Sequence, residues 1–440
     1  MISSRARRSV TAAHPTSART GIARYLTEVT IARVTLGVVA LHVVDDSFLQ
    51  PQPGTSATDH PVSGLVPLTV LVAAAWAYPR FRAGVRATIA LALGAFGIVV
   101  GIEGGYYAAK GSLSGDDYTG LLAIAAGLAL VGLGIVTLWR SRRAGSVPRR
   151  YLRRLLIGVG ALAAVYLLFA PLYISYVFTH VARGFVPVAD LGGAHEDVSF
   201  TTRDGLELRG WYIPSINGAA VIAFPGRKGP QRPARMLARH GYGVLLFDRR
   251  GEGESEGDPN VFGWEGDRDL EAALDFLQAR PDVDPDRIGG IGLSVGGEMM
   301  IDAAADLDGL QAVVSEGAGI RSFREALDIP QTRGRIETAL VHAVVTPAVA
   351  LFSNSLPPPS LVDLVGRIAP RPVFLVYAVP GQGGEAELTE TFYDAARAPK
   401  ELWLVPGSEH TGGIEAQPEE YERRVVGFFD RALLDEGSAR

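Results

Sequence analysis

The residue best suited to covalent chemistry is Ser294, in the run Gly-Leu-Ser-Val-Gly at 292–296. A strand-like stretch, 287–291, precedes this run, and a helix-compatible stretch follows it. A sharp turn from strand to helix strains the serine backbone and exposes its hydroxyl, and small residues on either side let neighbouring segments approach. In a chain with 52 glycines the five-residue pattern alone is weak evidence. Its place between strand and helix predicts that Ser294 is a nucleophile.

A serine hydroxyl needs a positioned base, because it is a weak nucleophile at neutral pH. Two histidines follow Ser294 in the chain. His342 lies in the apolar run 339–351, where a packed histidine of a core or an interface is expected. His410 lies in the polar turn 406–412, directly after the last predicted strand. The sequence therefore favours His410 as the base.

Attack of a serine on a carbonyl carbon also needs backbone N–H groups that point at the substrate oxygen on which negative charge develops. A predicted strand, 219–224, runs into a glycine-containing turn at 225–229. We expect the N–H groups of Arg227, in this turn, and of Val295, which follows the serine, to be these donors. The alternative is an ordinary glycine turn. Residues 248–255 have the form D-x-R-G-x-G-x-S, for which we expect a structural role.

Together these motifs resemble the α/β-hydrolase superfamily, nearest to its dienelactone-hydrolase-like, prolyl-oligopeptidase-like and serine-aminopeptidase-like members. The resemblance covers about residues 196–435. It implies hydrolysis of an ester, thioester or amide through an acyl-enzyme, without a metal or an organic cofactor. Pro225 departs from the pattern, because similar enzymes usually have histidine there.

The resemblance implies that the catalytic acid follows the seventh strand, but the loop 379–387 contains no aspartate. Glu385 is our first choice, because the glycines before it allow the loop to turn toward His410. The alternative is Glu316, at the end of the sixth predicted strand, from which some lipase-like members supply the acid.

The elements that must position these residues begin near residue 197. Short β-branched runs there alternate with amphipathic helices, which predicts a mostly parallel sheet with helices on both faces. We expect an α/β-hydrolase domain over 195–440, with helices at 263–280, 296–305 and 418–434. Its eight strands are predicted at 197–202, 206–213, 219–224, 243–248, 287–292, 311–315, 373–378 and 401–405.

Apolar residues make up 48% of the chain and concentrate before residue 180. We predict an integral, multi-pass protein of the cell membrane, with a cytoplasmic tail at 1–28 and a transmembrane region at 29–181. The first of its five segments is weaker than the others, because Asp45 and Asp46 lie near its end. The segments are 29–49, 61–79, 87–107, 119–139 and 155–178.

Orientation follows from the arginines. They concentrate in the loops 80–86 and 140–154 and in the tail, whereas the loops 50–60 and 110–117 carry aspartates and one lysine. Arginine-rich loops face the cytoplasm, so the last segment delivers the hydrolase domain to the outside. The tail lacks the apolar run of a removable signal peptide, and we expect no processing there.

The segment 320–367, between the sixth and seventh strands, is long enough to form a cap over the active site. Its apolar stretch, 343–352, and the nearby bilayer favour an apolar or amphiphilic, lipid-like acyl substrate. The alternative is a helix that only packs on the sheet.

Composition excludes several classes. The net charge of −5 provides no basic field for nucleic acid, and the absence of cysteine excludes thiol nucleophiles, disulfides and thiolate metal sites. Polar groups on the outer side of the membrane half form solvated helix ends or, alternatively, a metal or ligand site. They are Asp45, Asp46, His60, Glu103, Asp116 and Asp117.

Two other functions remain open at this point. One is a binding or sensing membrane protein whose hydrolase domain has lost catalysis. The presence of both Ser294 and His410 argues against it. The other is a transporter, which the absence of broken-helix signals argues against.

Overall fold

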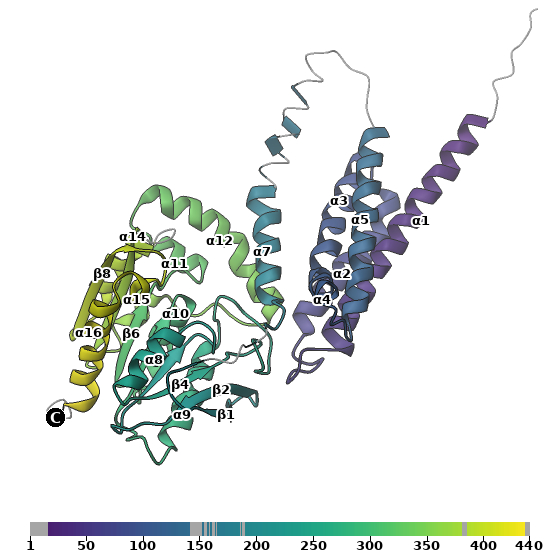
Figure 1. Ribbon diagram of the computed structural model, residues 1–440. Helices are drawn as coiled ribbons and strands as arrows, with labels where there is room; N and C mark the ends of the chain where they lie inside the picture. The colour runs from purple at the N-terminus through teal and green to yellow at the C-terminus, as the bar shows by residue number, and fades with distance from the viewer. Residues whose placement is uncertain are drawn as a thin grey trace, which may run out of the picture. The chain divides into compact units, whose positions relative to one another are not determined.

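The computed structural model describes residues 16–140, 165–184, 186, 190–380 and 385–435, and scattered positions between 152 and 163. The chain forms two compact units (Figure 1). Met1–Asp45 and Val66–Ala144 form the first, and Asp46–Leu65 and Gly145–Arg440 form the second.

The first unit is helical. Four helical stretches that lie wholly or mostly in this unit are apolar and long enough to cross a membrane: Thr27–Leu49, Pro61–Arg80, Ala83–Val100 and Asp117–Arg140. The predicted segment 87–107 differs from the structure, because the helix is interrupted at Gly101. The helices are α1 (Thr16–Val44), α2 (Pro61–Ala77), α3 (Ala83–Val100), α4 (Ile102–Lys110) and α5 (Asp117–Arg140).

Small residues bring α3 and α5 together. A Cβ added to Gly94 would lie 2.8 Å from the carbonyl oxygen of Gly127, so the backbones approach too closely for a side chain. A polar chain also crosses this unit. His42 Nε2 lies 2.8 Å from the Val100 oxygen, and its Nδ1 lies 3.1 Å from Thr119 Oγ1. Thr119 in turn donates to Asp45 at 2.8 Å.

The last predicted membrane segment, 155–178, falls partly outside the described residues. Its second half forms a π-helical turn, Val165–Phe169, and helix α7 (Ala170–Thr179). The described apolar part, Tyr166–Thr179, is shorter than a bilayer requires. A fifth apolar helix of sufficient length lies elsewhere, at Gly334–Ser353.

The second unit contains the predicted eight-stranded sheet, with strand order β1-β2-β4-β3-β5-β6-β7-β8. β2 runs antiparallel to β1 and β4, and the other neighbours are parallel. All eight sequence-predicted strands are confirmed. They are β1 (Glu196–Thr201), β2 (Glu207–Ile213), β3 (Ala220–Phe224), β4 (Gly243–Phe247), β5 (Ile288–Leu293), β6 (Ala312–Glu316), β7 (Val373–Pro380) and β8 (Lys400–Ser408).

Helices cover both faces of the sheet because its central strands are buried on both sides. In β3, Ile222 packs toward one apolar cluster, and Val221 and Ala223 pack toward the other. The first cluster includes residues of α9 (Gly266–Gln278), α10 (Val295–Asp306), α13 (Leu361–Val365) and α14 (Glu385–Ala395). The second includes residues of α8 (Gln231–Arg239) and α16 (Pro418–Phe429).

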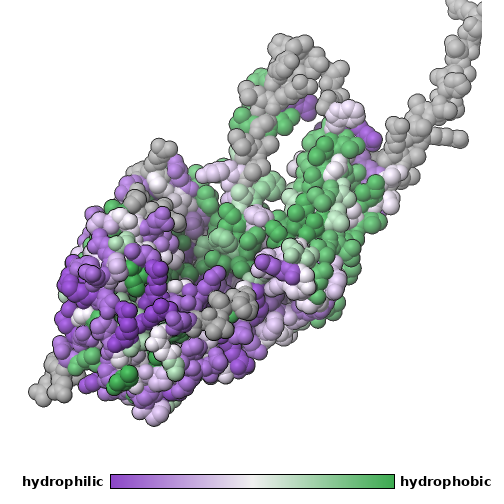
Figure 2. Space-filling model, in the orientation of Figure 1, coloured by the Kyte–Doolittle hydropathy of each residue, from purple (hydrophilic) through white to green (hydrophobic). Residues whose placement is uncertain are grey.

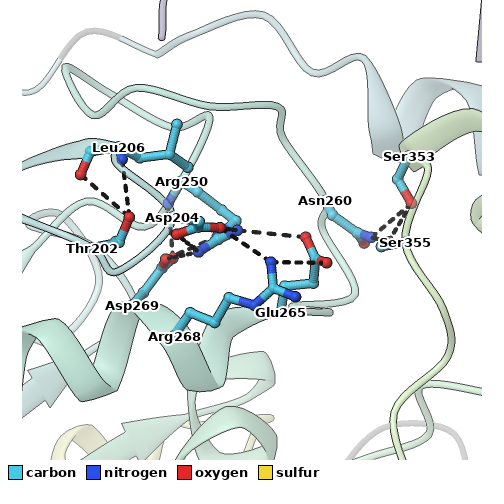
Figure 3. Close-up of polar contacts among 10 residues, drawn as sticks. All are labelled: Thr202, Asp204, Leu206, Arg250, Asn260, Glu265, Arg268, Asp269, Ser353 and Ser355. Carbon is cyan, nitrogen blue, oxygen red and sulfur yellow. Dashed lines mark hydrogen bonds and ion pairs between the residues drawn. The ribbon is translucent and has the colours of Figure 1, made fainter. Parts of the chain in front are cut away.

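The connection between β6 and β7 carries α11 (Phe323–Leu327) and α12 (Thr332–Ser353) as well as α13. Val345 and Val349 of α12 pack on Trp264. The end of α12 is also held, because Asn260 Nδ2 lies 3.3 Å from Ser353 Oγ (Figure 3).

The loop 46–65 lies with the second unit, although its sequence position suggested a membrane-region loop. The carbonyl oxygen of Pro53 accepts a hydrogen bond from the Gly257 N–H at 3.0 Å, and the Ser63 N–H donates to Asn354 Oδ1 at 3.3 Å. Long-range partners in the hydrolase loops therefore decide where this loop lies.

Candidate active site

Ser294 stands at the turn between β5 and α10, with φ 53° and ψ −126°. A non-glycine residue seldom adopts this strained conformation, and it turns the hydroxyl out of the sheet. The two glycines of the motif are fixed by close packing. A Cβ on Gly292 would lie 2.1 Å from the Gly296 oxygen, and a Cβ on Gly296 would lie 2.5 Å from Pro225 Cδ.

Three residues from three strand ends form one hydrogen-bonded series. His410 follows β8, and its Nε2 lies 2.9 Å from Ser294 Oγ. Its Nδ1 lies 2.8 Å from Oε2 of Glu385, the first residue of α14. The other carboxylate oxygen of Glu385 accepts the Ala378 N–H at 3.1 Å. The structure thus brings together the serine, the histidine and the first-choice acid.

Glu385 also affects the protonation of His410. Its carboxylate is only 3% exposed, and the hydrogen bond from His410 raises the pKa of the imidazole above its ordinary value. The buried carboxylate of Glu385 therefore favours the protonated, imidazolium form of His410.

Glu316, the alternative acid, binds elsewhere. Tyr421 donates its hydroxyl to Glu316 Oε2 at 2.7 Å, and the Gly413 N–H donates to Oε1 at 2.9 Å. These bonds anchor the turn that follows His410. Burial raises the pKa of Glu316.

The two expected oxyanion donors differ. The Val295 N–H is the first of α10 and has no acceptor within the helix, as a donor to substrate requires. The Arg227 N–H instead donates to Asp248 Oδ1 at 3.0 Å, and the Arg227 guanidinium binds Asp248 Oδ2 at 2.7 Å. The expectation for Arg227 missed this partner, because Asp248 lies 21 residues away in the D-x-R-G-x-G-x-S motif.

Arg250 of that motif is buried and lies at the centre of an ion-pair network (Figure 3). Arg250 donates from Nε to Asp269 Oδ1 at 2.8 Å and from Nη1 to Asp204 Oδ2 at 3.0 Å. Its Nη1 also lies 3.4 Å from Glu265. The network ties the loop after β4 to the start of α9, which agrees with the expected structural role.

An open pocket of about 890 Å³ adjoins the serine. Ser294 and His410 line it together with apolar groups, such as Leu293 and Ile414, and with cationic Lys228. Among the described residues that line it, none comes from α12. His342 lies on α12, and its Nδ1 is buried, as expected of a packed histidine.

Sequence reasoning missed Glu298. It lies four residues after Ser294, on the same side of α10, and that spacing was the available signal. Glu298 Oε1 accepts the Gly319 N–H at 2.9 Å, and burial raises the pKa of its carboxyl to about 7. It therefore holds the loop after β6.

The polar groups that the sequence placed on the outer side of the predicted membrane region do not gather into a metal centre. Within the described ranges, no three of His, Cys, Asp and Glu converge on a point that could hold an ion. Asp45 binds Thr119, whereas His60 lies in the second unit, 3.6 Å from Asp258.

Comparisons with known proteins agree with this architecture. Residues 187–331 match the family described as X-Pro dipeptidyl-peptidase (S15 family). The uncharacterized protein YfhR of Escherichia coli is 26% identical over 288 residues, which are 61% of this chain and 94% of that protein. The uncharacterized protein Rv2307c of Mycobacterium tuberculosis is 31% identical over 253 residues, or 55% of this chain and 80% of that protein.

Among solved structures, the Pyrococcus furiosus esterase Pf2001 covers 59% of this chain and 99% of its own, with 27% identity and a TM-score of 0.48. The sheet order, the serine turn and the sequence matches lead to one conclusion. The chain belongs to the α/β-hydrolase family of esterases and peptidases.

Proposed function

We propose that the protein is a membrane-tethered serine hydrolase that cleaves an ester, thioester or amide through an acyl-enzyme. The observation that supports this most directly is the hydrogen-bonded series Ser294–His410–Glu385, with bonds of 2.9 and 2.8 Å. The strained turn at Ser294 and the adjoining pocket also support it.

In the proposed reaction, Ser294 Oγ attacks the carbonyl carbon while His410 Nε2 takes its proton. The Val295 N–H donates to the resulting oxyanion. His410 then gives the proton to the leaving group, and the acyl group remains on Ser294. Water then attacks the acyl carbon while His410 Nε2 takes its proton; the bond to Ser294 Oγ breaks, His410 returns the proton to that oxygen, and the acid is released. Glu385 holds the imidazole in the required tautomer throughout.

The tether is the second part of the proposal. Four apolar helices in the first unit support it by length and composition, and the arginine-rich loops support an orientation with the hydrolase domain outside the cytoplasm. The substrate we propose is an acyl compound of small-molecule or lipid-like character. The family description also keeps a peptide amide among the candidate bonds.

A fluorophosphonate probe tests the chemistry. We expect the purified full-length protein to be labelled at Ser294, since an activated hydroxyl attacks phosphorus as it attacks a carbonyl. Ser294→Ala should abolish labelling, and the nearby Ser315→Ala should retain it. A folded wild-type protein that neither labels nor hydrolyses any acyl substrate would favour the alternative, a hydrolase-fold protein that binds or senses.

A further inference from the structure

Helix α12 exposes an apolar stripe. Ile336 and Leu340 are 54% and 53% exposed, and Ala343 and Pro347 continue the same face. The spacing of four, three and four residues places all of them along one side of the helix. The stretch Gly334–Ser353 is also apolar enough to cross a membrane.

The opposite side of α12 is fixed to the hydrolase domain. Val345 and Val349 are buried with Trp264, and Thr346 Oγ1 accepts the Phe323 N–H at 2.7 Å. The orientation of the helix about its axis is therefore set, and the stripe faces away from the domain.

The topology forbids α12 from crossing a bilayer. The helix lies between β6 and β7, which pair directly in one sheet with Val313 opposite Val373. A crossing helix would place these two strands on opposite sides of the membrane. If such a helix contacts a membrane, it must lie along the membrane surface, because both of its ends return to one sheet.

Helix α7 shows which partner the stripe fits. It ends the predicted membrane segment 155–178 and packs on α12, where the Tyr176 and Phe352 rings lie 5.5 Å apart. α7 exposes apolar side chains of its own, Tyr173 and Ile174. Apolar surface is visible where α12 meets α7, whereas the surface around α16 is largely hydrophilic (Figure 2).

We propose that α12 is an interfacial membrane helix, which inserts Ile336, Leu340, Ala343 and Pro347 into the boundary between lipid headgroups and acyl chains beside α7. This inference rests on the proposed membrane tether and not on catalysis. It gives the segment between β6 and β7 a lipid surface as its partner and fixes the hydrolase domain on the bilayer at a second place.

Because the chain contains no cysteine, a single introduced cysteine can be spin-labelled specifically, and the depth of that label in a membrane can be measured. Single variants Ile336→Cys and Leu340→Cys carry a nitroxide in the full chain, reconstituted into phosphatidylcholine vesicles. Both side chains are exposed, so the label displaces no core packing. Leu128→Cys, on α5 and 59% exposed, is the lipid control, and Ile216→Cys, 87% exposed on the hydrolase domain, is the water control.

We expect the labels at residues 336 and 340 to collide more often with oxygen than with a water-soluble nickel chelate. The label at residue 128 should behave in the same way, and the label at residue 216 should collide more often with the nickel chelate. If the labels at residues 336 and 340 collide mainly with the nickel chelate, as at residue 216, while the label at residue 128 contacts lipid, the inference fails and the tether stands. If both collisions are low and the labels broaden one another, a second copy covers the stripe, which also overturns the inference. A water-exposed label at 128 would overturn the tether and the inference together. None of these readings depends on hydrolysis by Ser294.

Discussion

At the scale of single residues, three buried carboxyl groups around the serine have different hydrogen-bond partners. Glu385 binds the imidazole of His410. Glu316 binds the turn that follows His410, and Glu298 binds the loop after β6. Only Glu385 bonds directly to a proposed catalytic group. Replacement by glutamine, which keeps one oxygen acceptor, separates these roles.

We expect Glu385→Gln to lower kcat by on the order of 10⁴-fold with little effect on folding, because it removes the charge that orients and stabilises the imidazolium. Since Glu385 raises the pKa of His410, its removal lowers that pKa. The base must be neutral, so the acid limb of kcat/KM moves to lower pH. A pH profile of ester turnover measures both effects. Glu316→Gln is the matched control, and the reverse pattern would assign the acid to Glu316.

Glu298→Gln should change stability more than the acid limb, because Glu298 contributes less than Glu385 to the raised pKa of His410. Burial raises its pKa from 4.5 to about 7, so between these values the folded protein keeps a proton that the unfolded chain releases. The free energy of unfolding therefore falls as pH rises through this window. The variant, which still accepts the Gly319 N–H, should be more stable at pH 8 by on the order of 3 kcal/mol. Denaturant unfolding at pH 4.5 and pH 8 checks this. A variant no more stable than the wild type at pH 8 contradicts it.

At the scale of elements, the loop after β4 is held by charges that packing has removed from water. Asp269 is fully buried and binds both the N–H and the guanidinium of Arg250. The same loop carries Asp248, which binds Arg227 beside the active-site pocket. The ion pairs therefore position the loops on both sides of this region.

We expect Asp269→Ala to destabilise the protein by about 3 kcal/mol or more, because it leaves a buried guanidinium with fewer acceptors. Thermal unfolding measures the loss. Glu420→Ala is the control, since Glu420 binds the exposed Arg423 and should matter little. Equal shifts for the two variants would show that the buried network is no stronger than a surface pair.

Local sequence predicted the central strands because they are short apolar runs buried on both faces, such as β3 and β4. The serine turn was also predictable from local sequence, because its strand, turn and helix are adjacent in the chain. Local sequence did not predict two features: the bond between Arg227 and Asp248, and the break between α3 and α4. The first joins two separate loops, and the second depends on Gly101 packing against the backbone of Gly120.

At the scale of the whole molecule, the arginine-rich loops predict that the hydrolase domain lies outside the cytoplasm. Alkaline phosphatase fused after residue 440 should therefore be active, since it needs an oxidising compartment for its disulfides. A fluorescent reporter that folds only in the cytoplasm should be dark at the same position. The opposite pair of results would invert the orientation.

The loop 46–65 also sets an order of events during synthesis. Asn354 donates to the carbonyl oxygen of Asp59, which is 295 residues earlier in the chain. At about 5–20 residues per second, the ribosome takes roughly 15–60 s to make the intervening chain. For that time the loop exists without this partner, so the hydrolase domain completes its fold by closing on a segment that was translated long before Asn354.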